Sequence, residues 1–414
     1  MLKVAFIDDG INQGFISEEI PFENYTADET GVREASSITE ISHGTMCYQI
    51  FRDQAQSSYH LISIKVLDNT TGTGNHKSLL IALKWCANQN IDIINMSMGT
   101  RQYADFSSIA RAIEELSQTV IIAACSNSNN LTFPACLPNV IGVRHSNHPE
   151  LIDNYMYIDN PHDQIEIMIN ADSIPVSIDT NGNIYNNFNP KCRIEIAMFS
   201  ENVSTESDIN RHSQLKSLYM GASNSFATPI ITARVFEYMT LDCRTKEDIM
   251  IYLRNNGIKN TNIITYELYK SLLLAWEDVK VPIILLPSFT REVTNKLIAL
   301  TNIFVEDGYR AIALSQEKYS SPKDLLYSLT WNGDIPITIP ELIELYYNFA
   351  LPDIIFLQME IADLTALPDN MQPDLILRTQ EVRDIDIIAW DKKCVLYYGE
   401  SVEGLFSQIK QLLI

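Results

Sequence analysis

Three polar residues of different chemistry stand where regular elements are expected to begin or end. Asp8 ends the apolar run at residues 2–7, His43 precedes a Gly-Thr pair, and Ser225 opens a stretch that predicts a helix. A serine hydroxyl becomes a nucleophile when a histidine removes its proton, and a carboxylate orients that histidine. Together the three residue types suggest nucleophilic attack on a carbonyl group.

Each of these residues also has a plain structural interpretation. Asp8 could be a turn residue, His43 a helix cap or surface residue, and Ser225 an N-cap. Asn127 lies in the polar run at residues 126–130, which could be an ordinary loop. The chemical interpretation therefore depends on whether the chain brings these residues together.

The elements that must position them alternate along the first half of the chain. Strands are expected at residues 2–7, 61–67, 91–96 and 119–124, and helices at 77–88, 107–116, 225–236 and 246–255. This succession predicts an α/β fold, with a mostly parallel sheet and helices on both faces. Sites in such sheets lie at the carboxyl ends of strands. The turns after Ile7, Met96 and Ala124 all belong to that edge.

Composition narrows the class of protein. The 414 residues carry a formal net charge of -22, with 46% hydrophobic and 20% charged residues. This acidic balance argues against a nucleic-acid partner, which requires clustered Lys and Arg. No segment has the roughly 18 uncharged apolar residues of a membrane helix, and the N-terminus does not resemble a signal peptide. Seven widely spaced cysteines fit reduced thiols, so a cytoplasmic location is expected.

Six collinear motifs give the chain a family resemblance. The Asp8 strand, the sequence His43-Gly44-Thr45 and the run from Gly221 to Pro229 resemble the catalytic motifs of the subtilase family of serine peptidases. The segments between them resemble that family as well, in the order expected. They are residues 71–99, 120–127 and 133–143.

The resemblance implies a role for each matching residue. Asp8, His43 and Ser225 would form a catalytic triad, and the Asn127 side chain and the Ser225 backbone N–H would form the oxyanion hole. The residues implied in substrate binding are Ser97, Met98, Gly99, Ala124, Cys125, Ser126 and Phe133. No cofactor and no required metal are expected.

Several residues depart from the family pattern. Ser223-Asn224 stands where Gly-Thr commonly precedes the nucleophile, and Ser126 stands where a glycine usually precedes the oxyanion asparagine. Ser223 is a rival nucleophile in principle, but the spacing to Ala227 and Pro229 favours Ser225. Cys47, one helical turn after His43, resembles the thiol-bearing branch of the family. We expect it to pack in the core and to make the protein sensitive to mercurials.

The chain is expected to contain two domains. A peptidase domain should span 1–257 and a junction 258–280. A smaller α/β domain at 281–414 resembles a degenerate nucleotide-binding fold without a phosphate-binding Gly-rich loop. A docking role for the substrate leader, or for a modifying-enzyme partner, is the simplest expectation for this second domain.

The layout, with no prosegment expected before residue 2, resembles bacterial subtilases that mature ribosomally made, modified peptides. The expected function is that of a serine endopeptidase that removes the leader from a precursor peptide. Two alternatives remain open: a non-catalytic peptide-binding pseudoprotease, and a regulatory intracellular protease of cell proteins. The sequence does not determine the cleavage-site preference, the substrate or the oligomeric state.

Overall fold

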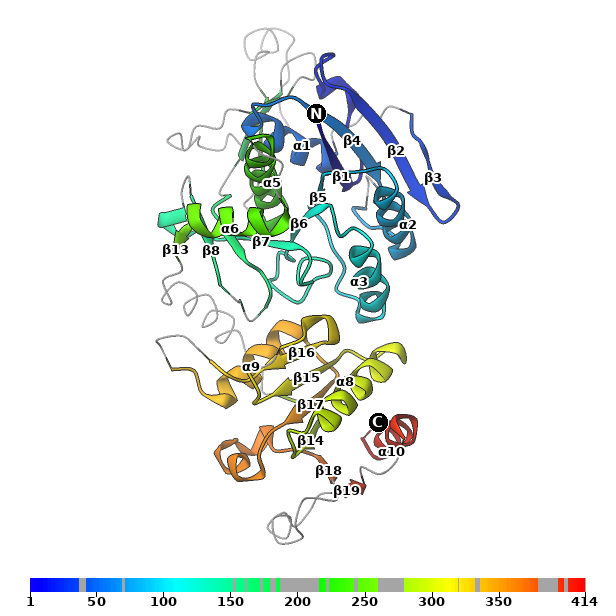
Figure 1. Ribbon diagram of the computed structural model, residues 1–414, viewed down its shortest axis with the longest axis vertical. Helices are drawn as coiled ribbons and strands as arrows, with labels where there is room; N and C mark the ends of the chain where they lie inside the picture. The colour runs from blue at the N-terminus through cyan, green and yellow to red at the C-terminus, as the bar shows by residue number, and fades with distance from the viewer. Residues whose placement is uncertain are drawn as a thin grey trace, which may run out of the picture. The chain divides into compact units, whose positions relative to one another are not determined.

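The computed structural model describes most of the chain (Figure 1). The described residues are 1–36, 42–68, 71–151, 154–159, 161, 163–171, 174–178, 184–186, 216–220, 223–241, 245–259, 279–318, 320–331, 336–378, 394–397 and 401–413. The chain divides into two compact units. Unit 1 comprises Met1–Thr100 and Ser108–Lys259, and unit 2 comprises Arg101–Ser107 and Asn260–Ile414.

Unit 1 is built on a ten-stranded sheet in which most neighbouring strands run parallel. In spatial order the strands are β13 (Ile258–Lys259), β8 (Tyr155–Tyr157), β9 (Ile167–Ile169), β7 (Ile141–His145), β6 (Val120–Ala124), β5 (Ile93–Met96), β1 (Leu2–Asp8), β4 (Tyr59–Lys65), β2 (Phe22–Asp28) and β3 (Gly31–Glu34). The β2–β3 and β8–β9 pairs are antiparallel. This is the α/β fold with a mostly parallel sheet that the sequence predicts.

The central strands β6, β5 and β1 are neighbours and run in the same direction. Met96 pairs with Ala123, and Asn95 pairs with both Phe6 and Ile122, so the three strands end almost in line. The predicted location of the three turns at one edge of the sheet is therefore confirmed.

Among the described residues, five α-helices lie wholly or mostly in unit 1. They are α1 (His43–Gln54), α2 (His76–Ala87), α3 (Phe106–Glu114), α5 (Asn224–Leu241) and α6 (Lys246–Asn256). Only the first two residues of α3 are assigned to unit 2. Successive side chains of β1 point to opposite faces of the sheet, and both sets are buried: Val4 and Phe6 on one face, Ala5 and Ile7 on the other. Helices must therefore cover both faces, as expected.

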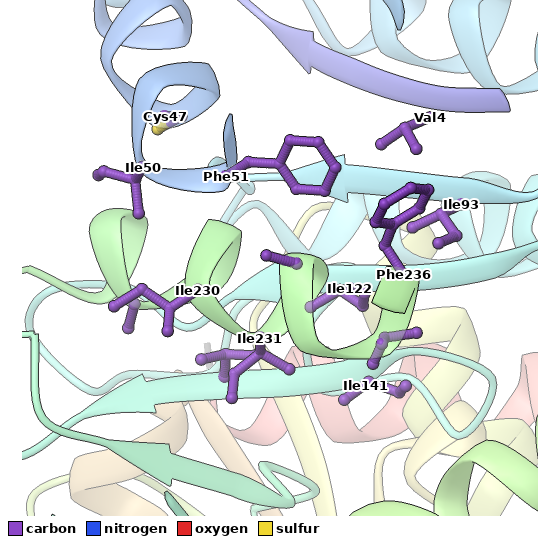
Figure 2. Close-up of a cluster of buried hydrophobic side chains, with 14 of the residues drawn as sticks. Val4, Cys47, Ile50, Phe51, Ile93, Ile122, Ile141, Ile230, Ile231 and Phe236 are labelled. Atoms are coloured by element: carbon purple, nitrogen blue, oxygen red, sulfur yellow. The ribbon is translucent and has the colours of Figure 1, made fainter. Parts of the chain in front are cut away.

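The α1–α5 face of the sheet contains the main apolar cluster of unit 1 (Figure 2). Phe51 of α1 and Phe236 of α5 meet edge to face, with ring centroids 5.5 Å apart. Phe51 also packs on Phe6 of β1 at 5.5 Å. Full burial of such a side chain contributes about 1.5–3 kcal/mol. This cluster fixes the two helices on which His43 and Ser225 lie.

The sequence Asp179-Thr180-Asn181-Gly182, between two apolar runs, predicts a β-hairpin, and the strands on either side of it do pair. β10 (Ile174–Ile178) pairs antiparallel with β11 (Ile184–Asn186) and with β12 (Lys216–Met220). The turn itself lies outside the described residues. The sequence of residues 150–220 predicts antiparallel strands on the edge of the main sheet. The antiparallel pair β8–β9 confirms this prediction, but it is wrong for β10, β11 and β12, which form a three-stranded sheet of their own.

Unit 2 contains a second sheet, in which all six strands pair in parallel. The strand order is β16 (Leu326–Ser328), β15 (Ala311–Ser315), β17 (Ile354–Gln358), β14 (Ile283–Leu286), β18 (Leu375–Arg378) and β19 (Cys394–Tyr397). Its helices are α8 (Arg291–Glu306), α9 (Ile339–Ala350) and α10 (Val402–Leu413). The apolar run at residues 386–390 lies outside the described residues.

A helix that spans a membrane must be both long and apolar, and the described helices can be judged on both properties. None of them combines enough residues with a sufficiently apolar sequence to cross a bilayer.

Candidate active site

Asp8 and His43 meet at the carboxyl edge of the central strands. Asp8 is the last residue of β1 and His43 the first residue of α1. The His43 Nδ1 atom lies 2.9 Å from Asp8 Oδ1 and 3.0 Å from Oδ2. The Asp8 side chain is 1% exposed, whereas that of His43 is 33% exposed. Because Nδ1 is engaged by the carboxylate, Nε2 remains to act on another group.

A second carboxylate fixes the start of α1 against the end of β1. The backbone N–H of His43 donates to Asp9 Oδ2 at 3.0 Å, and that of Gly44 donates to Asp9 Oδ1 at 2.7 Å. Ser42, the N-cap, donates to the Gly10 carbonyl oxygen at 2.5 Å. A Cβ atom on Gly44 would stand 2.7 Å from that oxygen, so the approach requires a glycine. Asp9 and Ser42 therefore determine where the His43 ring lies.

Ser225 is the second residue of α5 and is half-buried. Two residues earlier, Ser223 accepts a hydrogen bond from the Phe226 N–H at 3.2 Å, which is the role of an N-cap. The helix packs beside α1, and the Cys47 thiol lies 3.8 Å from the Ser225 carbonyl oxygen. That oxygen has no helical N–H partner, because the residue four positions on is Pro229. Cys47 thus links the two helices.

The pKa values of the residues around His43 depend on which of the neighbouring groups carry charge. Negative charge on the Cys47 sulfur, 3.9 Å from both His43 ring nitrogens, would raise the pKa of His43 if that thiol were ionised. Burial lowers the pKa of His43, and the Asp8 carboxylate raises it. Burial raises the pKa of Cys47, so its thiol stays protonated near neutral pH and Asp8 supplies the stabilising charge. Burial, together with the charge of Asp8, also raises the pKa of Asp9.

Asn127 follows β6 in an exposed turn. Its side-chain oxygen accepts a hydrogen bond from the backbone N–H of Asn224 at 3.0 Å. Ser126, the residue before it, fastens the turn by accepting from the Asn130 N–H at 2.9 Å. The Asn127 side chain is therefore tied to the residue that immediately precedes Ser225.

The segments expected to bind substrate converge beyond β5. Thr100 and Phe133 exchange backbone hydrogen bonds of 2.8 and 2.9 Å, which joins the segment after Ser97 to the segment after Asn127. A Cβ atom on Gly99 would stand 2.6 Å from Thr132 Cγ2, so the two segments are closely apposed. Of the seven implied residues, Gly99 is exposed, Met98 and Ser126 are half-buried, and Ser97, Ala124, Cys125 and Phe133 are buried.

The sequence did not single out all the residues that support the site. Asp9 and Asn224 bond to site residues, and the buried Asn95 links Ser97 to Thr232 of α5 through bonds of 3.1 and 2.8 Å. A buried asparagine in the apolar run Ile93–Met96 was the available signal for the last of these.

Within the described part of the chain, Asp8, His43 and Cys47 have potential ligand atoms within 4.8 Å of one another. The bonds described above already engage all three side chains with one another.

Comparison with known proteins assigns the chain to a protein family. A model of the subtilase family matches residues 2–239. Subtilisin E of Bacillus subtilis (strain 168) is 28% identical over 162 residues, which cover 34% of this chain and 40% of that protein. Subtilisin DY of Bacillus licheniformis is 31% identical over 91 residues, covering 20% and 32%. The match therefore spans well under half of the length of these relatives.

Solved structures with some likeness to the chain include two peptide-processing proteases. A lanthipeptide protease shows 16% identity and a TM-score of 0.42, covering 60% of this chain and 78% of that one. The prenylagaramide maturation protease PagA shows 16% identity and a TM-score of 0.38, covering 67% and 84%.

Proposed function

This chain belongs to the subtilase family, and we propose that it is a serine endopeptidase with Asp8, His43 and Ser225 as its catalytic triad. The observation that carries the proposal is the pair of contacts, 2.9 and 3.0 Å, between the buried Asp8 carboxylate and the His43 Nδ1 atom. Such a pair holds the imidazole in one tautomer and leaves Nε2 to take the proton of a hydroxyl.

The reaction follows from these roles. The Ser225 oxygen attacks the carbonyl carbon of a peptide bond while His43 accepts the hydroxyl proton. The Asp8 carboxylate stabilises the imidazolium, which then gives its proton to the leaving amine. Water, activated by the same histidine, hydrolyses the acyl-enzyme. Throughout, Asp8 stays ionised.

The oxyanion formed in each step needs donors that are already in place. In the proposed site these are the Asn127 side-chain amide and the Ser225 backbone N–H at the positive end of α5. The Asn127 oxygen already accepts a bond from the Asn224 N–H, so its amide nitrogen remains to donate. The substrate strand would lie along Ser97–Gly99 and pair with it by backbone hydrogen bonds.

The finer proposal is that the substrate is a ribosomally made, modified precursor peptide from which the enzyme removes a leader. Its support is unit 2, a separate parallel-sheet unit that extends beyond residue 239, where the family match ends. A unit outside the peptidase fold gives the protein a surface for docking a leader, or a modifying enzyme that carries the peptide. Domain boundaries near 257 and 281 are part of this proposal.

The test is cleavage of the precursor peptide encoded beside this protein, followed by mass spectrometry, with a proteome-derived peptide library run in parallel. The wild type should cut the precursor at one bond, and S225A should not cut it. S223A is the matched control, because it removes a neighbouring hydroxyl that serves as an N-cap, and it should retain activity. Cleavage by S225A would refute the triad. Cleavage of the library but not of the precursor would refute the leader-removal role alone.

A further inference from the structure

Asn224, the residue before Ser225, joins three segments through one side chain. Its Nδ2 donates to the Ser126 carbonyl oxygen at 2.5 Å, and its Oδ1 accepts from the His145 N–H at 2.7 Å. Its backbone N–H donates to Asn127 Oδ1 at 3.0 Å. The start of α5 is thereby bonded to the ends of both β6 and β7.

The Asn224 side chain points into the protein and is 5% exposed. Both of its ends bond to backbone groups of neighbouring strands, so it serves the framework and does not face a peptide.

These bonds determine the direction of the Asn127 amide. A backbone N–H can bond only to the oxygen of that amide, so the nitrogen of Asn127 must point away from Asn224. Asn127 itself stands in an exposed turn. Its position relative to Ser225 thus depends on the hydrogen bonds that hold Ser126 and the first turn of α5 together.

We propose that Asn224 is a positioning residue of the oxyanion hole: by bonding the start of α5 to Ser126, Asn127 and His145, it holds the Asn127 amide in place as a donor beside the Ser225 N–H. The inference rests on the proposed function. Because Asn224 acts through Asn127, replacing Asn224 should reduce activity only when residue 127 is asparagine. Oxyanion donors act by preorganisation, so a small displacement weakens them in the transition state more than in the bound substrate.

The experiment measures the second-order rate of phosphonylation of the full chain by a fluorophosphonate, whose phosphoryl oxygen occupies the oxyanion position. Four proteins are compared: wild type, N224A, N127A and the double variant. N127A should slow labelling by about 100-fold or more. N224A should slow it by about tenfold when Asn127 is present, but by less than about twofold when residue 127 is alanine.

The inference is overturned if N224A slows labelling by the same factor whether residue 127 is asparagine or alanine, or if N224A does not slow labelling at all. A purely structural role would reduce thermal stability and leave the two factors equal. The matched control is N88A, since Asn88 is exposed and bonds only within its helix, to the Lys84 carbonyl oxygen at 2.9 Å; its labelling rate should match the wild type.

If N224A does not fold, N224S is used in the same cycle. The shorter serine hydroxyl can keep only one of the two side-chain bonds of Asn224. When residue 127 is asparagine, N224S should therefore label at a rate between those of N224A and the wild type. A wild-type chain that does not label would refute the proposed function, and the inference with it. A wild type that labels, with equal factors in the two backgrounds, would refute the inference alone.

Discussion

Replacing Asp9 with alanine tests how the histidine is held against its carboxylate partner. The substitution removes the acceptor of the His43 and Gly44 N–H groups, which lie 3.0 and 2.7 Å from the carboxylate oxygens. Hydrogen bonds to a charged group contribute about 1.5–3 kcal/mol each. Since burial already raises the pKa of Asp9 and so makes its charge costly, the low end applies. D9A should therefore lose about 3 kcal/mol of unfolding free energy.

The same change should also impair the chemistry. With its N–H released, His43 can shift relative to Asp8, and a misplacement of about 1 Å can cost about 100-fold in rate. We expect D9A to slow fluorophosphonate labelling by about 10- to 100-fold. D9N, which can accept only one of the two bonds, should fall between D9A and the wild type in both measurements.

Urea unfolding and the labelling rate are measured on the same preparations. The control is T245A, which breaks the capping box of α6, where Thr245 and Asp248 bond reciprocally. T245A should lose about 1 kcal/mol of stability and label at the wild-type rate. If D9A loses no more stability than T245A and labels normally, then Asp9 does not position the histidine and the reasoning is wrong.

Three further predictions follow from the described contacts. First, labelling requires neutral His43, whose raised pKa places the acid limb of the pH–rate profile above pH 6.5. Burial keeps the Cys47 thiol protonated, so C47S should leave that limb in place. An acid limb at or below pH 6.5 would contradict the raised pKa of His43. Second, burial raises the pKa of Glu166 to about 8 from 4.5, so the folded state keeps a proton that the unfolded chain has released, and stability falls as pH rises through that window. E166Q should therefore unfold at higher urea than the wild type at pH 8, by up to about 4 kcal/mol, and show little difference at pH 5; equal gains at both pH values would argue against a buried neutral Glu166. Third, G99A would place a Cβ 2.6 Å from Thr132 Cγ2. It should therefore raise KM for peptides while leaving fluorophosphonate labelling nearly unchanged. An unaltered KM would show that the Ser97–Gly99 segment does not bind the substrate.

The positions of the main elements could be predicted because local patterns determine them. The apolar run at residues 2–7 ends at an acidic turn, and β1 ends there too, at Asp8. The helix expected after Ser225 begins one residue earlier, at Asn224. The strand expected at 61–67 lies at Tyr59–Lys65, two residues earlier, and Leu67 forms an isolated bridge with Gly74. Parallel neighbours then bring the turns to one edge without further information.

The supporting bonds could not be predicted, because they join residues that are distant in the chain. Asn224 bonds to Ser126 and His145 across 98 and 79 residues, and Asp9 bonds to His43 across 34. In the sequence, Asn224 was only a departure from a familiar pair and Asp9 only a turn residue. Sheet membership is equally non-local: the hairpin strands β10 and β11 have the expected pattern, but nothing in them shows that they form a separate sheet.

The most direct test of the account is the site of covalent modification. The full chain is treated with a fluorophosphonate and digested, and the adduct is located by tandem mass spectrometry. We predict one phosphonyl group on Ser225, no adduct in S225A, and strongly slowed labelling in H43A. An adduct on Ser223, or an unmodified wild-type protein that is folded by its thermal transition, would contradict the proposed triad.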